Sequence, residues 1–198
     1  DVNTARGDLG GAGTTTNGVV FGGYTPTITA VTELWNGSAW TEVNDLNTAR
    51  KALGSAGIYT AAIGFGGEVP SKTGKTEQWD GTNWTEAGDL SSARSYLAGA
   101  GSSTSALGFA GTTGSLVTST EEFTQPPSSE SKLIEGLMWF NSASSTLKGF
   151  GASTPTGTWA TGGSLNSKRQ DGSTSGVQTA SIVGGGYTTT YVALTEIY

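Results

Sequence analysis

Residues 47–90, NTARKALGSAGIYTAAIGFGGEVPSKTGKTEQWDGTNWTEAGDL, are one copy of a repeat that accounts for most of the 198-residue chain. An arginine and a glutamate recur with a spacing of 44 residues, at Arg6, Arg50 and Arg94 and at Glu33, Glu77 and Glu121. A fixed period of 20 to 50 residues is typical of solenoids and propellers. The sequence therefore predicts a repeat architecture.

Each copy contains four short segments that have the pattern of β-strands. In the quoted copy they are residues 53–58, 61–67, 75–80 and 83–87, separated by Gly, Thr, Ser and Asn. The dipeptide Asp80-Gly81 between the last two is typical of a hairpin turn. No stretch has a useful helical period. The pattern predicts an all-β fold built of four-stranded antiparallel blades.

Four copies are visible, and the third is interrupted. Between Phe123 and Trp159 lie 35 residues, whereas four lie between Trp79 and Trp84, which indicates an insertion of 31 residues. The fourth copy stops where its last strand should begin. We therefore divide the chain into blades 1 to 3 (1–124), an insertion with a hairpin of 137–141 and 146–150 (125–158), and the outer strand of blade 3 with an incomplete blade 4 (159–198).

Composition excludes several kinds of function. Ten basic and 16 acidic side chains give a formal charge of −6, so nothing favours binding to a nucleic acid or to an anionic membrane. The chain contains no His and no Cys, which removes imidazole and thiolate catalysis and the usual zinc ligands. No apolar run is long enough for a transmembrane helix. We expect no catalytic residue, no metal site, no cofactor and no membrane insertion.

The repeat resembles the kelch family. The features that carry the resemblance are a double glycine after the second strand, an aromatic residue in the third, a Trp at the start of the fourth and an Arg before the next copy. In chain order these are Gly22-Gly23, Gly66-Gly67 and Gly185-Gly186; Trp35, Trp79, Phe123 and Tyr198; Trp40, Trp84 and Trp159; and Arg6, Arg50, Arg94 and Arg169. The third copy departs from the pattern with Ala110-Gly111. The resemblance implies a β-propeller.

The uniform copies are similar to kelch-like repeats in large proteins of marine bacteria and tailed phages, and the inserted hairpin resembles modules of phage tail and fibre proteins. Kelch propellers usually close with six or seven blades, and four are visible here. The chain also opens at the repeat phase of Asp45, so we expect a processed product or a piece of something longer. Three ways to complete the ring remain open: further chain, blades from a second chain, or a small propeller that closes on itself.

Residues that recur in every copy are interpreted as structural, including an Arg–carboxylate contact and Trp side chains in the core. Binding is expected in the loops after the second strands, which differ between copies. Their candidate binding residues are Tyr24, Lys72 and Tyr187. Trp139 and Phe140 of the insertion are further candidates, because they would be costly to leave in water.

The sequence predicts a non-enzymatic structural and adhesive binding module of a phage virion (tail fibre, spike or decoration protein) or of a bacterial surface appendage. It would be extracellular or part of the virion. Its partners would be copies of itself, neighbouring subunits or a surface glycan. One alternative is a carbohydrate-active enzyme that uses Glu68 and Asp89, which we interpret as acids outside the repeat pattern. Another is an intracellular kelch-type adaptor.

Overall fold

The computed structural model of the protein describes residues 1–126, 138–141, 146–149, 157–162, 164–166, 168, 170–178, 180–187 and 195–197. Every helix or strand assigned in these residues is a β-strand. The strands form three four-stranded sheets, one three-stranded sheet and two small hairpins. The prediction of an all-β fold made of four-stranded antiparallel blades is therefore confirmed.

Blade 1 contains β1 (Gly10–Gly13), β2 (Gly18–Phe21), β3 (Thr32–Trp35) and β4 (Trp40–Val43). Blade 2 contains β5 (Gly54–Ile58), β6 (Ala61–Phe65), β9 (Thr76–Trp79) and β10 (Trp84–Glu86). The short strands β7 (Glu68–Val69) and β8 (Ser71–Lys72) pair in the loop after β6. In both blades each strand pairs with the one next to it in the chain order of the blade.

Blade 3 contains β11 (Ala98–Ser102), β12 (Ser105–Phe109), β13 (Thr120–Thr124) and β16 (Thr158–Thr161). Its outer strand β16 follows the insertion, and Trp159 pairs with Phe123 just as Trp84 pairs with Trp79. Blade 4 contains β17 (Ser173–Val177), β18 (Ala180–Gly184) and β19 (Thr195–Ile197).

Within the insertion, β14 (Met138–Asn141) and β15 (Thr146–Gly149) form the expected antiparallel hairpin. Residues 127–137, 142–145 and 150–156 lie outside the described part of the chain, and the side chains of β14 and β15 do too.

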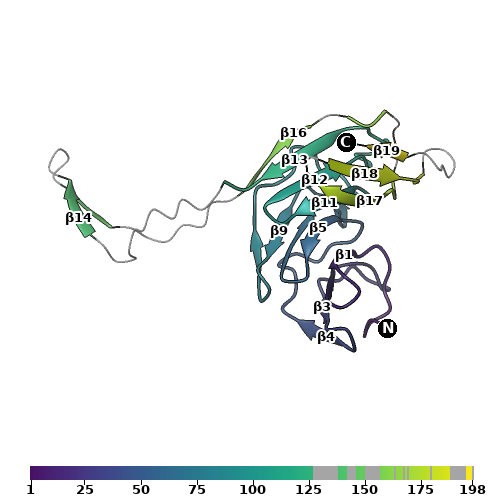
Figure 1. Ribbon diagram of the computed structural model, residues 1–198, viewed down its shortest axis with the longest axis horizontal. Coiled ribbons are helices and arrows are strands. Elements are labelled where there is room, and N and C mark those ends of the chain that lie inside the picture. The colour runs from purple at the N-terminus through teal and green to yellow at the C-terminus, as the bar shows by residue number, and fades with distance from the viewer. Residues whose placement is uncertain are drawn as a thin grey trace.

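The first strands of the blades, β1, β5, β11 and β17, lie next to one another in this order, and blades 1 and 4 occupy the two ends of the array (Figure 1). These strands are rich in glycine, alanine and serine, because only small residues allow neighbouring blades to approach closely along their inner edge. Gly99 illustrates the closeness: a Cβ added to it would lie 2.4 Å from the carbonyl oxygen of Ser55.

The hydrophobic core is divided into three clusters, one between each pair of consecutive blades. In the first, Phe21 of blade 1 meets the ring of Trp84 of blade 2 edge to face, with 4.6 Å between ring centroids. In the second, Phe65 of blade 2 meets Trp159 of blade 3 in the same way at 4.8 Å. Trp79 and Trp84 are therefore core residues, as predicted, and Trp159 packs against the second cluster, whereas Trp35 and Trp40 belong to none of the three clusters.

Candidate functional site: the loop face at the mouth of the inner cavity

The recurring arginines form buried ion pairs with glutamates of the blades. Nη2 of Arg50 lies 3.0 Å from Oε1 of Glu77, and its Nη1 donates hydrogen bonds to the carbonyl oxygens of Gly66 and Lys75. Both charged side chains are fully buried, and desolvation by burial lowers the pKa of Arg50 against the opposing effect of Glu77. The guanidinium therefore joins the end of the second strand, the start of the third strand and the carboxylate of the same blade.

Blades 1 and 3 contain an equivalent ion pair. Arg94 pairs with Glu121 at 2.9 Å, and its Nη1 donates to the carbonyl oxygens of Ala110 and Ser119. Arg6 pairs with Glu33 at 3.0 Å, but among the described residues its guanidinium has no hydrogen-bond partner. The second oxygen of each glutamate accepts a backbone hydrogen bond at 2.6 to 2.7 Å from the residue three positions before the repeat arginine, namely Asn3, Asn47, Ser91 and Asn166. The structural role predicted for the Arg–carboxylate contact is confirmed in the described blades. Arg169 lies outside the described residues.

A second recurring feature is a backbone bridge on the face that carries the loops after the second strands. The residue after the repeat arginine pairs with the residue after the double-glycine position. The four bridges are Gly7–Tyr24, Lys51–Glu68, Ser95–Thr112 and Gln170–Tyr187. The backbone is the same in every blade, whereas the side chains differ in size and charge. These positions can therefore carry a function without a role in forming the blade.

The next residue in each copy has a left-handed backbone although none of the four is glycine. The φ angles are 54° for Asp8, 53° for Ala52, 55° for Tyr96 and 56° for Asp171. Backbone hydrogen bonds between blades hold this conformation. The amide of Ala52 donates to the carbonyl oxygen of Asp8, and the amide of Tyr96 donates to that of Ala52, both at 2.8 Å. The amide of Asp171 donates to the carbonyl oxygen of Tyr96 at 3.3 Å. We call Asp8, Ala52, Tyr96 and Asp171 the mouth ring.

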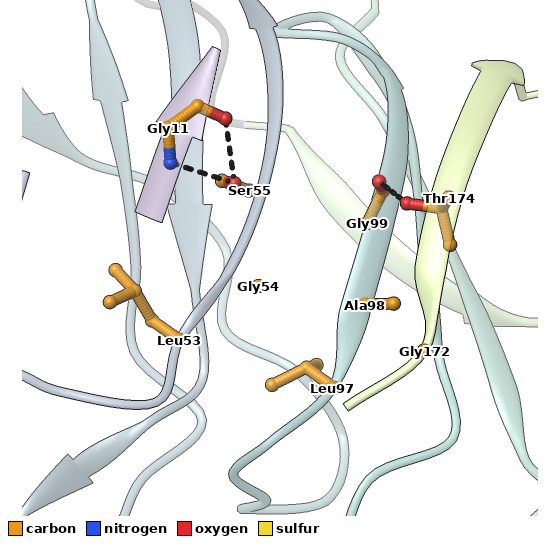
Figure 2. A pocket seen from close by; sticks show the side chains of 9 residues that line it. All are labelled: Gly11, Leu53, Gly54, Ser55, Leu97, Ala98, Gly99, Gly172 and Thr174. Atoms are coloured by element: carbon orange, nitrogen blue, oxygen red, sulfur yellow. Dashed lines mark hydrogen bonds between the residues drawn. The ribbon is translucent and has the colours of Figure 1, made fainter. Parts of the chain in front are cut away.

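The mouth ring adjoins a cavity of about 290 Å³ between the inner strands. The ring residues Ala52, Tyr96 and Asp171 directly precede the cavity-lining residues Leu53, Leu97 and Gly172. Figure 2 shows that the hydroxyl groups of Ser55 and Thr174 point at the backbone of Gly11 and Gly99 on neighbouring strands, to which they are hydrogen-bonded. The cavity wall therefore offers backbone groups, small side chains and two leucines, Leu53 and Leu97, and no charged side chain lines it.

Charged and aromatic side chains gather beside the mouth ring. Nζ of Lys51 lies 5.0 Å from the ring centroid of Tyr24 and 3.5 Å from Oε2 of Glu68. Oε1 of Glu68 accepts a hydrogen bond from the hydroxyl of Ser95 at 2.9 Å and lies 4.0 Å from Nζ of Lys72. We call Tyr24, Lys51, Glu68, Lys72 and Ser95 the loop-face cluster.

The electrostatic field at the mouth disfavours further negative charge. Burial raises the pKa of the Tyr96 hydroxyl, with Asp8 adding to the effect and Lys51 opposing it. Partial desolvation also raises the pKa of Asp171, against a hydrogen bond from Gln170 and with a smaller contribution from Asp8. Asp8, Tyr96 and Asp171 thus influence one another across three different blades.

The structure brings two of the predicted binding residues into one cluster. Tyr24 and Lys72 are joined through Lys51 and Glu68, and the Tyr24 side chain is 43% exposed. Tyr187 occupies the position of Tyr24 in blade 4, where its backbone exchanges two hydrogen bonds with Gln170. Trp139 and Phe140 form part of β14, but their side chains lie outside the described residues.

Sequence reasoning missed Lys51, Ser95 and the mouth ring. A signal for Lys51 was present: it directly follows the recurring Arg50, yet its own position varies between copies. Aspartate adopts a left-handed backbone more often than most residues, which is a weak signal at Asp8 and Asp171, but alanine and tyrosine seldom do, so the residue types did not indicate one shared conformation.

The interpretation of Asp89 as an acid outside the repeat pattern is wrong. Asp89 accepts a hydrogen bond from the amide of Thr76 at 3.1 Å, and Asp45, 44 residues earlier, accepts the same bond from Thr32 at 3.1 Å. This aspartate is a repeated structural residue. Glu68 does vary between copies, and its carboxylate is shared by Lys51, Lys72 and Ser95.

The described residues contain no group of three or more His, Cys, Asp or Glu side chains that could hold a metal ion. No helix in the same part of the chain is long and apolar enough to cross a membrane.

No known family model matches the chain, and no curated protein shows significant sequence similarity to it.

Proposed function

We propose that the protein is a non-enzymatic structural and adhesive module with kelch-like propeller blades, and that it binds its target through the loop-face cluster. In this proposal it is a component of a phage virion or of a bacterial surface appendage and acts outside the cell. The observation that carries the proposal is a division of roles. The recurring charged residues are used within the blades, whereas the partly exposed loop-face cluster is found at one place among the described residues.

The kelch-like part of the proposal is supported by what the shared residues do. The first glycine of each pair has φ near +65°, at 64° for Gly22, 66° for Gly66 and 64° for Gly185. This left-handed conformation turns the chain at the end of the second strand, where Arg50 donates a hydrogen bond to the carbonyl oxygen of Gly66 and Arg94 donates one to that of Ala110. The double-glycine position and the arginine thus act together within a blade, and the Trp packs between blades.

The chemistry of the cluster favours a surface glycan as target. An exposed tyrosine ring offers a flat apolar face on which a sugar ring can stack. Lys51 and Lys72 supply ammonium donors on both sides of Glu68, whose carboxylate accepts hydrogen bonds. The side chains of these two lysines are 23% and 29% exposed, so both can be reached from solvent.

The test is binding of the purified chain to an array of bacterial surface polysaccharides, comparing the wild type with Tyr24→Ala and Lys72→Ala. We expect each change to weaken binding about five- to tenfold, as for the loss of one stacking or charge-assisted contact. Lys75→Ala is the matched control, because Lys75 forms an exposed ion pair with Glu86 away from the cluster. Equal binding by all four proteins would place the target elsewhere.

The location is tested separately. Mass spectrometry of purified virions and of sheared surface filaments should detect the chain in one of the two preparations. Its recovery only from the cell interior would contradict the structural role, whatever the glycan array shows.

A further inference from the structure

The two ends of the blade array present faces that are covered everywhere else in the molecule. We call the face of each sheet that packs against the next blade in the chain its front face, and the face that packs against the preceding blade its back face. Between consecutive blades, the front face of one sheet packs on the back face of the next. Blade 4 has a front face and blade 1 has a back face to which the described residues supply no neighbouring blade (Figure 1). The internal interfaces show what should cover each of them.

The internal contact has two specific parts. The first is the Phe–Trp contact described above, in which the phenylalanine ring of one blade also lies over a glycine of the next: a Cβ on Gly64 would lie 2.7 Å from the Phe21 ring, and one on Gly108 would lie 3.1 Å from the Phe65 ring. The second is a hydrogen bond from the Trp indole to a threonine of the preceding blade. Nε1 of Trp84 donates to Oγ1 of Thr32 at 3.0 Å, and Nε1 of Trp159 donates to Oγ1 of Thr76 at 3.2 Å.

The front face of blade 4 keeps the threonine of this contact, has glycine in place of the phenylalanine, and leaves two apolar side chains in solvent. Ile182 pairs with Ile197 in the same register in which Val19 pairs with Leu34 in blade 1. Val19 is only 1% exposed because blade 2 covers it, whereas Ile182 is 49% and Ile197 is 81% exposed. Thr195, at the position of Thr32 and Thr76, is also exposed. Among the described residues of blade 4, Ile182 and Ile197 are the exposed large hydrophobic side chains.

The back face of blade 1 is the complementary half. Trp35 and Trp40 are stacked with centroids 5.5 Å apart, as Trp79 and Trp84 are at 5.4 Å. The blade 2 pair is buried at 2% and 6% exposure, whereas Trp35 and Trp40 are only half-buried. Among the described residues, none accepts a hydrogen bond from Nε1 of Trp40, although its counterparts Trp84 and Trp159 both have a threonine partner.

The side-chain volumes at the two end faces also match. In the first two interfaces a large phenylalanine opposes a glycine. At the end faces the sizes are reversed: blade 4 has Gly184 at the phenylalanine position, and blade 1 has Val20 at the glycine position. A small residue thus opposes a larger one in both cases, which keeps the volume of the contact filled. The third interface differs, since Phe109 packs with Val183 and no outer-strand Trp of blade 4 is among the described residues.

We infer that the front face of blade 4 docks on the back face of blade 1 of a second copy of this chain. Ile182 and Ile197 then cover the Trp35–Trp40 pair, and Nε1 of Trp40 donates to Oγ1 of Thr195 of the other copy. The contact is heterologous, joining unlike surfaces head to tail, so it produces either a closed ring or a filament. The inference goes beyond the proposed function, because it uses the ends of the array and not the loop-face cluster.

The experiment measures the mass of the full chain in solution by light scattering or sedimentation over a dilution series. The wild type should form a species of two or more copies that dissociates on dilution. Ile197→Glu should abolish it, because a charge would be buried against the Trp pair. Trp40→Phe keeps an aromatic ring but removes the N–H donor and part of the apolar surface, so it should weaken assembly about fivefold or more. Ile58→Glu is the matched control, since Ile58 is 54% exposed but lies on neither end face.

A mixing experiment tests the head-to-tail geometry. Ile197→Glu retains an intact blade 1 face, and Trp40→Ala retains an intact blade 4 face, so neither variant should assemble alone. A mixture of the two should form a hetero-dimer, because the intact blade 4 face of one variant can dock on the intact blade 1 face of the other. Circular dichroism establishes that both variants are folded. A wild type with the mass of a single chain at every concentration, or folded variants that do not combine, would overturn the inference. Glycan binding by a single-chain species would leave the proposed function standing while the inference failed.

Discussion

The hydroxyl of Ser55 satisfies both hydrogen-bonding groups of Gly11, the residue 44 positions earlier in the chain. Its Oγ accepts a bond from the Gly11 amide at 3.1 Å and donates one to the Gly11 carbonyl at 2.9 Å. The pattern recurs in the second half of the array, where the Thr174 hydroxyl donates to the carbonyl of Gly99. Inner strands that belong to different sheets, and so share no ladder, are thereby joined by hydroxyl groups.

Ser55→Ala should destabilise the protein by about 1 kcal/mol, because the backbone groups of Gly11 lose a partner that solvent replaces only in part. Chemical denaturation with intrinsic Trp fluorescence gives the free energy of unfolding. Ser71→Ala in the exposed loop strand β8 is the control and should change it by less than about 0.5 kcal/mol. Equal effects of the two changes would show that the hydroxyl bond between the strands contributes nothing.

Arg50→Met should destabilise the protein by about 3–5 kcal/mol, because it leaves the fully buried carboxylate of Glu77 without its ion-pair partner. Thermal unfolding and denaturant titration both report this change. Lys75→Met removes one partner of the exposed Lys75–Glu86 pair and should cost less than about 1 kcal/mol. Comparable losses for the two variants would contradict the structural role of the buried pair.

Gly66→Ala should be strongly destabilising, by about 2–4 kcal/mol, and Ala110→Gly should be nearly neutral. Gly66 has φ of 66°, and an added Cβ would lie 2.7 Å from the carbonyl oxygen of Arg94. Ala110 has φ of 53° at the same place in blade 3 and already fits its methyl group into the third core cluster. Relief of its left-handed strain, about 1 kcal/mol, is offset by the loss of a buried methyl worth about 0.8 kcal/mol.

Asp171→Asn should raise stability near neutral pH and have no effect in strong acid. Burial raises the pKa of Asp171 in the folded protein above its unfolded value. The protonated form is therefore favoured on folding, so this residue's contribution to stability is greatest below the ordinary aspartate range and falls as the pH rises through the folded pKa. Asparagine tolerates the left-handed backbone at this position and carries no charge. Unfolding curves at several pH values test this: a wild-type-minus-variant difference that is constant with pH would contradict it.

The sequence was most informative where the repeat imposes its own constraint. The 44-residue spacing predicted the positions of the strands, the structural Arg50–Glu77 contact and the resumption of blade 3 at Trp159 after the insertion. Each of these depends on residues that recur from blade to blade. The same logic failed for Asp89, whose counterpart Asp45 was overlooked. It could not reveal the Lys51–Glu68 contact either, since that pairing follows from a backbone bridge between a linker and a loop 17 residues apart in the chain.

In the mouth ring, the backbone conformation does not depend on which side chain is present. An acid, a methyl group, a phenol and a second acid occupy one conformation with φ of 53° to 56°, held by amide and carbonyl groups that every residue except proline possesses. Chemical variety at the cavity entrance therefore requires no change in the backbone. A combinatorial library at these four positions should yield folded proteins that differ in what they recognise, which makes the entrance a natural place for new specificities to arise or to be engineered.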